Sequence, residues 1–246
     1  DYKIADFTVK EKYDITVMTL FDVGVNKQFL AEHIHYKTVF HRMFRGNRYV
    51  QKLFSPKALY KFCVKDKYDI LVAYLEGTCT RIIGGCQDPD TIKVGWRHIV
   101  EGDREFLGCY RSMKEAIRIH KNLDKVVGVS ETVIEAFEEV TGLIGISTVK
   151  YNTNETEKIK ELSKEEVENP KFRPDEMLSV IGVAKVRPRK GFMRLASAHK
   201  KLWEEGYRYR IYVLGEGEER TAIEMRYWGN CPYQAIADAL QCSITG

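Results

Sequence analysis

Four cationic side chains stand close together at a point where they could bind an anion: Lys185, Arg187, Arg189 and Lys190, with Gly191 directly after them. If a helix begins here, its first turn presents unpaired N–H groups and partial positive charge, which suit a phosphate group. Glycine lets the backbone approach such a ligand closely. The alternative is a solvated basic turn, because charge runs of this kind usually face water. The residue types alone leave both interpretations open.

The elements around these cations favour a ligand site. Residues 178–184 (LSVIGVA) and 209–215 (YRIYVLG) are short apolar runs typical of strands. Between them, apolar side chains recur at helical spacing at Phe192, Leu195, Ala196, His199, Leu202 and Trp203. The pattern predicts a strand, a helix that ends near Gly206, and a second parallel strand. The cations then lie at the carboxyl end of a strand, where ligands bind in open α/β sheets.

The preceding part of the chain shows the same alternation. Short β-branched runs predict buried strands at residues 14–21, 69–77, 92–96, 124–130 and 147–152. The clearest helix follows Ser130, which can cap its first turn, and ends at Gly142. This alternation predicts an α/β fold with parallel sheets. Residues 155–176 are highly charged and include two prolines, so we expect two domains, residues 1–165 and 166–246.

Composition limits the classes of function. The 39 Lys and Arg residues exceed the 35 Asp and Glu residues by only four, which is too weak an excess to indicate nucleic-acid binding by itself. None of the six cysteines forms a C-x-x-C pair, and no histidine pair has the spacing of a zinc motif. We therefore expect free thiols in a reducing compartment and no metal site. The longest apolar run, residues 70–75, is too short to span a membrane.

Five segments in a fixed order carry a family resemblance. They are YDILVAYLEG (68–77), KVGWRH (93–98), LDKVVGVSETVIEAF (123–137), VKYNTNETEKIKEL (149–162) and AKVRPRKGFMRLASAHKKLWEEGYRYRIYVLGEGEER (184–220). In this order they resemble the group 1 (family 4) glycosyltransferases, and the match extends over about residues 11–224. The resemblance implies a GT-B architecture, in which two Rossmann-like domains with parallel sheets face a cleft.

The resemblance also implies an activity. Members of this family transfer a sugar, with retention of configuration, from a nucleotide-sugar to an acceptor. For this chain we expect a UDP-sugar as donor and a saccharide or lipid-linked acceptor, in cell-surface polysaccharide synthesis. No metal or other cofactor is implied, because cationic side chains and a helix end stabilise the leaving diphosphate. The expected location is the cytoplasm, at the inner face of the membrane.

Site residues follow from the same motifs. Lys185 and Lys190 match the family's cations that hold the donor phosphates, and His98 matches a histidine that faces the donor sugar; these three would be catalytic. The remaining matches are Gly191, Gly215 and Gly217 near the donor, Glu76, Gly77 and Ser130 on the acceptor side, and Asn152 between the domains. Each has a structural alternative: Ser130 and Glu76 can cap helices, His98 can be an ordinary core or surface histidine, and the glycines can form plain turns.

The chain departs from the family pattern at three places. Ala184 stands where the family has glycine. The family's first strand and Gly-rich loop have no counterpart before residue 14, and the segment WGNCPYQAIADALQCSITG (228–246) ends before the family's paired-glutamate motif. We therefore expect a truncated second domain. The alternative function is a non-catalytic relative that binds a nucleotide or a membrane surface.

A basic and aromatic segment, HRMFRGNRYVQKLF (41–54), suggests a further surface. Arg42, Arg45, Arg48 and Lys52 recur at three- and four-residue spacing and would share one face of a helix, although Gly46 and Asn47 predict a turn between them. The segment can be an ordinary basic surface, an RNA-binding face or a face that lies on anionic lipid. We favour membrane contact over nucleic acid.

Overall fold

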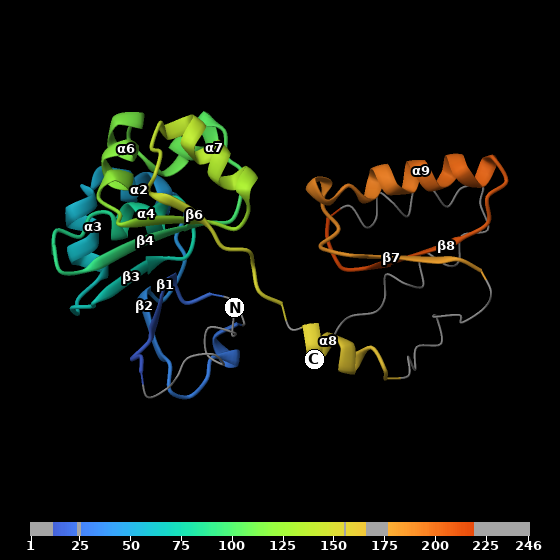
Figure 1. Cartoon of the computed structure of the whole chain (residues 1–246), viewed down its shortest axis with the longest axis horizontal. Coiled ribbons are helices and arrows are strands. Elements are labelled where there is room, and N and C mark those ends of the chain that lie inside the picture. Colours follow the sequence, from blue (N-terminus) through green and yellow to red (C-terminus); the bar gives the residue numbers. More distant parts are fainter. Residues whose placement is uncertain (1–11, 24–25, 155, 166–176, 219–246) are drawn as a thin grey trace. The chain divides into compact units, whose positions relative to one another are not determined.

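The computed structural model describes residues 12–23, 26–154, 156–165 and 177–218, without the side chains of Asn26, Asn47 and Arg48 (Figure 1). The chain divides into two units, Asp1–Asn154 and Glu155–Gly246. The mixed α/β class with parallel strands, predicted from the alternating pattern, is confirmed. The finer placement of a domain boundary between residues 165 and 166 stays a prediction. The C-terminal segment from residue 219, with Cys231 and Cys242, lies outside the described residues.

The first unit contains two parallel sheets. The smaller sheet pairs β1 (Thr16–Phe21) with β2 (His35–Phe40). The larger sheet has the order β3-β4-β5-β6, formed by β3 (Ile70–Ala73), β4 (Ile92–Arg97), β5 (Lys125–Gly128) and β6 (Ser147–Val149). In the register, Ala73 of β3 pairs with Gly95 of β4, and Arg97 of β4 pairs with Gly128 of β5. The last residues of these three neighbouring strands therefore meet at one edge.

Helices connect these strands. The α-helices are α2 (Asn47–Leu53), α3 (Pro56–Cys63), α4 (Thr78–Ile83), α5 (Asp103–Phe106), α6 (Met113–Lys121) and α7 (Glu131–Thr141), and the 3-10 turns are η1 (Asn26–Phe29) and η2 (Leu107–Cys109). The predicted helix after Ser130 is confirmed: Ser130 Oγ accepts the N–H of Val133, and Gly142 ends α7 with φ 67°. None of the described helices is long and apolar enough to cross a membrane.

One apolar core fixes the larger sheet beneath its helices. Ala73, Ala116, Val126 and Phe137 are each at most 1% exposed and belong to a single cluster. Burying such side chains contributes about 25 cal/mol per Å² of apolar surface. The strands β1 and β2 also pack against this cluster, through Met18, Leu20 and Val39. The sheet edge that bears the candidate residues is thus part of a well-packed element.

The second unit contains one strand–helix–strand motif. Its described elements are α8 (Thr156–Leu162), β7 (Ser179–Val183), η3 (Pro188–Lys190), α9 (Phe192–Glu204) and β8 (Arg210–Leu214). β7 and β8 are parallel, as predicted, and α9 lies along one face of them (Figure 1). Val186, Phe192, Ile211 and Val213 form the buried cluster between helix and strands. This packing sets the position of the loop between β7 and α9.

Candidate functional site

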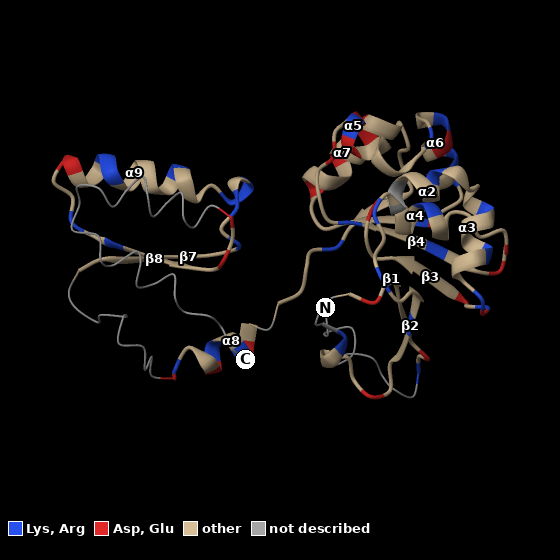
Figure 2. Ribbon diagram, turned by 180° about the vertical axis from the view of Figure 1, so that it is seen from behind, with Lys and Arg blue, Asp and Glu red and all other residues tan. Residues whose placement is uncertain are grey.

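The loop from β7 to α9 presents its cations to solvent. Val186 is fully buried, and its N–H donates to the carbonyl of Glu216 at 3.0 Å, so the middle of the loop is anchored to the segment after β8. The neighbouring Lys185 is exposed. Figure 2 shows Lys and Arg gathered at this end of α9. The loop therefore combines a fixed backbone with outward-facing positive charge.

The first turn of α9 has no side-chain cap. Gly191 precedes it with φ 74° and ψ 17°, a left-handed conformation that favours glycine, and Lys190 stands one residue before in η3. No acidic residue lies in the first turn. A helix of this length (13 residues) carries partial positive charge at its N-terminus. The uncapped amides and Lys190 are thus available to an anion.

The charges of this loop are not balanced within the part of the chain that is described. There, Lys185, Arg187, Arg189 and Lys190 are all exposed, and none of the ion pairs found includes any of them. By contrast, Lys200 on the far half of α9 pairs with Glu204 at 3.9 Å. The loop therefore keeps an excess of positive charge, which favours an anionic ligand.

Gly215 and Gly217 have a packing role. A Cβ on Gly215 would lie 1.9 Å from the carbonyl oxygen of Ala184, and one on Gly217 would lie 2.1 Å from that of Val186. Both distances are far inside van der Waals contact. The loop after β8 thus lies directly against the loop that carries Lys185, and only glycine fits at the two contact points. The two glycines therefore have a structural role in packing these loops together, and their place near the donor stays a prediction.

In the first unit, Glu76 and His98 meet at the carboxyl edge of the larger sheet. Glu76 follows β3 and His98 follows β4. Glu76 Oε1 accepts hydrogen bonds from the backbone N–H of His98 and, at 2.9 Å, from that of Ile99. The carboxylate therefore joins the two loops. The sequence motifs placed both residues in one site, and the structure brings them into direct contact.

The ring of His98 is oriented by Tyr74. Its Nε2 lies 2.8 Å from the carbonyl oxygen of Tyr74, and the two rings are in edge contact at 4.9 Å between centroids. Because a carbonyl oxygen only accepts, Nε2 carries the proton of the neutral ring. Nδ1 then retains a lone pair that can accept a hydrogen bond from a hydroxyl group. Tyr74 was not among the residues singled out from the sequence, although it lies in the same motif as Glu76.

Gly77 lies beside the same loops. Its φ of 76° and ψ of −112° are accessible to glycine, and a Cβ would lie 2.8 Å from Cys109 Sγ. The residue is therefore constrained by both conformation and space. Ser130 follows β5 and caps α7, as its structural alternative proposed. Asn152 lies exposed in the segment after β6.

Arg97 and Glu101 form a charged pair next to His98 that sequence reasoning missed. Arg97 Nη2 and Glu101 Oε2 are 2.5 Å apart, and both side chains are largely buried. Burial raises the pKa of Glu101 above its ordinary value, and the opposing effect of Arg97 does not cancel it. Arg97 also lies over the rings of Phe106 and Phe137. An i, i+4 spacing of opposite charges usually indicates an ion pair on a helix. Here Arg97 is the last residue of β4 and Glu101 lies in the following loop.

Other observations bear on cofactors and thiols. Within the described ranges, no group of three or more His, Cys, Asp or Glu side chains is arranged to hold a metal ion. Cys63, Cys79, Cys86 and Cys109 are free thiols, of which Cys63 and Cys86 are buried. Burial raises the pKa of Cys79 to about 11, so this thiol stays protonated near neutral pH.

The chain was compared with protein-family models and with curated proteins. No protein-family model matches the chain. No curated protein matches it either. The function proposed for the chain therefore depends on the quoted motifs and on the geometry of the two groups of residues.

Proposed function

We propose that the chain is a glycosyltransferase that moves a sugar from a nucleotide-sugar, in the first instance a UDP-sugar, to a saccharide or lipid-linked acceptor with retention of configuration. The architecture proposed for it is GT-B, with the described strand–helix–strand motif of the second unit in the donor domain. The observation that carries the proposal is the loop between β7 and α9. There an uncapped helix N-terminus, Gly191 and exposed Lys185 and Lys190 lie at the carboxyl end of a parallel strand.

The role proposed for these residues is electrostatic. When the bond between sugar and diphosphate breaks, negative charge increases on the leaving phosphate oxygens. Lys185 and Lys190 and the first amides of α9 would stabilise that charge more strongly in the transition state than in the ground state. Val186 and Gly215 fix the backbone from which the cations project, so that only their side chains have to reorient toward the phosphate.

His98 would face the donor sugar, and Glu76 would lie on the acceptor side. The neutral His98 ring can accept a hydrogen bond at Nδ1 from a sugar hydroxyl, while Tyr74 holds Nε2. Glu76 acts as a positioning residue because its carboxylate is bonded to the backbone of His98 and Ile99. Gly77 and Ser130 would contribute the adjoining backbone surface.

Nucleotide release tests the proposal. The chain is incubated with UDP-, GDP- and ADP-sugars, with and without a saccharide acceptor, and Lys190→Ala is compared with Lys201→Ala, an exposed lysine on the later part of the same helix. One nucleotide should be released by the wild type and by Lys201→Ala. Lys190→Ala should lower the rate at least about tenfold, because hydrogen bonds to charged groups contribute about 1.5–3 kcal/mol.

The second candidate function is nucleotide binding without transfer. It is favoured by the internal hydrogen bonds of Glu76 and His98, which give both residues a structural role without any substrate. Saturable, Lys190-dependent binding of a nucleotide with no release from any donor would support this function. Absence of both binding and release would contradict both functions.

A further inference from the structure

A long stretch of the first unit carries positive charge and no carboxylate. Between Glu32 and Asp66 the sequence contains no Asp or Glu. It contains the cations Lys37, Arg42, Arg45, Arg48, Lys52, Lys57, Lys61 and Lys65. These residues extend over β2, the loop before α2, α2 itself and α3. A one-sign stretch of this length creates a local field that attracts anionic surfaces, even though the whole chain is only mildly basic.

Helix α2 turns apolar side chains toward solvent. Tyr49 and Leu53 are each 77% exposed, and Val50 is 41% exposed. Their helical spacing places them on one face. On the opposite side, the polar Gln51 is only 9% exposed. A surface helix usually buries its apolar side chains and exposes its polar ones, and α2 does the reverse. Its outer face is therefore suited to contact an apolar partner.

Buried Arg81 holds the end of α2 in place. Its Nη1 donates to the carbonyl of Gln51 and its Nη2 to that of Phe54, each at 2.8 Å. The guanidinium is only 1% exposed and pairs with Glu115 at 3.0 Å. The last carbonyls of a helix normally lack partners within the helix. Here the buried guanidinium of Arg81 donates hydrogen bonds to these carbonyls, so the turn between α2 and α3 is fixed.

Arg111 holds two more carbonyls of the same turn. Its Nε donates to Lys52 O at 2.5 Å, and its Nη2 donates to Leu53 O at 2.6 Å. With Arg81, four consecutive carbonyls at the end of α2 have guanidinium partners. Leu53 and the following Phe54, which is 51% exposed, are therefore held outward by the fold. Their exposure is a feature of an anchored backbone.

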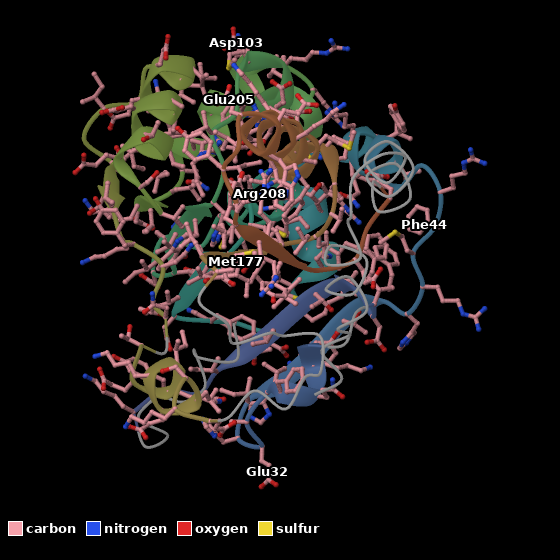
Figure 3. All side chains as sticks on the ribbon, turned by 90° about the vertical axis from the view of Figure 1, so that its right-hand side faces the viewer. Glu32, Phe44, Asp103, Met177, Glu205 and Arg208 are labelled. Carbon is pink, nitrogen blue, oxygen red and sulfur yellow. The ribbon has the colours of Figure 1, made fainter. Side chains whose placement is uncertain are left out.

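Aromatic rings connect α3 with the loop before α2. The ring of Phe40 lies 5.6 Å from that of Phe44 and 5.8 Å from that of Phe62. Phe44 is 37% exposed and Phe62 is 54% exposed. Figure 3 shows Phe44 on a loop at the margin of its unit. Lys65 Nζ lies over the Phe62 ring at 5.3 Å from its centroid, and the exposed Lys57 and Lys61 stand one turn apart on α3.

We infer that the outer faces of α2 and α3, with the loop 41–46, form a surface that binds an anionic lipid bilayer. The apolar side chains would enter the boundary between headgroups and acyl chains, and the cations would lie at the lipid phosphates. The exposed rings of this surface could also stack on RNA bases, but its exposed aliphatic side chains, Val50 and Leu53, favour the acyl-chain boundary of a bilayer, because they gain nothing from stacked bases or phosphates. Arg42 and Arg45 contribute from the loop, since α2 begins only at Asn47.

Two corrections to the sequence prediction accompany this surface. The four predicted cations do not share one helical face, because Gly46 forms the left-handed turn that the alternative interpretation predicted, with φ 79°. Lys52 is partly buried, and its Nζ donates to the carbonyl of Leu107 at 3.4 Å. The surface is therefore defined by exposed apolar residues and by Lys57 and Lys61 as much as by the predicted arginines.

Vesicle flotation of the whole chain tests this inference. The protein is mixed with vesicles of phosphatidylcholine alone, or with one third phosphatidylglycerol, at low and high salt. It should bind the anionic vesicles and lose most of that binding at high salt. Tyr49→Ser combined with Leu53→Ser should weaken binding at least about tenfold. Lys57→Glu combined with Lys61→Glu should do the same.

Matched controls separate the surface from general charge and hydrophobicity. Ile144→Ser removes an apolar residue that is 81% exposed elsewhere, and Lys114→Glu with Arg118→Glu reverses two exposed cations one turn apart on α6. Both controls should bind like the wild type. Equal binding to neutral vesicles, unchanged binding by the surface variants, or binding to single-stranded RNA but not to vesicles would each overturn the inference. No nucleotide-sugar is present, so the outcome is independent of the proposed transferase activity.

Discussion

At the scale of single residues, Glu76 has two roles that can be separated. Its carboxylate accepts two backbone hydrogen bonds from the loop after β4, and one of these donors is the N–H of His98, so Glu76 also positions that residue. The first role concerns the stability of the sheet edge. The second concerns the orientation of a group proposed to face a sugar.

Replacing Glu76 distinguishes these roles. Glu76→Ala removes the acceptor for the N–H groups of His98 and Ile99, and should lower the free energy of unfolding by about 1–2 kcal/mol in urea titrations. Glu76→Gln keeps an oxygen acceptor and should recover most of that stability. If the alanine variant is as stable as the wild type, the carboxylate does not hold the two loops together.

Gly215 decides how the loops of the second unit pack. In Gly215→Ala the new methyl group would lie 1.9 Å from Ala184 O, so we expect destabilisation of more than about 2 kcal/mol. Hydrogen exchange should show faster exchange of the amides in β7 and β8. Gly108→Ala, where no atom lies within 4 Å, is the control and should leave exchange unchanged. Unaltered protection of β7 in Gly215→Ala would disprove the close packing.

At the scale of elements, the sequence predicted the strands that are continuous apolar runs and the helix with clear caps. The strands β1, β3, β5 and β6 and helix α7 lie within the predicted ranges, and β4 ends one residue beyond its predicted range of 92–96. β2 was missed because His35 and Lys37 alternate with apolar residues in a strand whose outer positions face solvent. α4 was missed because it is short and hides Arg81, a charged residue, in the core. Its buried partner Glu115 lies far away in sequence, so no local pattern could reveal it.

Helix α6 gives the first unit a pH dependence. His120 is 1% exposed, and its Nδ1 lies 2.9 Å from the carbonyl of Ala116. Burial lowers the pKa of His120 from 6.5 to about 4. The unfolded chain therefore takes up a proton below pH 6.5 that the folded chain does not accept until about pH 4, so stability falls as the pH falls through this window.

Urea unfolding between pH 7 and pH 4.5 checks this effect. The free energy of unfolding should decrease toward acid in the wild type. His120→Gln removes the titrating group, so its free energy of unfolding should change less over the same range, whatever its stability at pH 7. Parallel pH profiles for the two proteins would show that His120 is not responsible.

At the scale of the whole molecule, the chain contains two units, and each has candidate site residues at the carboxyl ends of parallel strands. The first joins Glu76 and His98, and the second carries Lys185 and Lys190 beside the start of α9. The cationic loop could be predicted because strand, charge run, glycine and helix are adjacent in sequence. The ring contact of Tyr74 with His98 could not, because it depends on how β3 and β4 are paired. The pair Arg97–Glu101 could not either, because its burial depends on how the helices pack over the sheet.

The measurement that tests the central claim most directly is an amide-resolved NMR titration of the chain with UDP and with uridine. If phosphate is held at the start of α9, UDP should shift the amide signals of Gly191, Phe192 and Met193, and uridine, which has no phosphate, should leave them unchanged. Lys190→Ala should weaken the UDP effect at least about tenfold. Binding of UDP that leaves these three amides unshifted, or the absence of any UDP binding, would contradict the account.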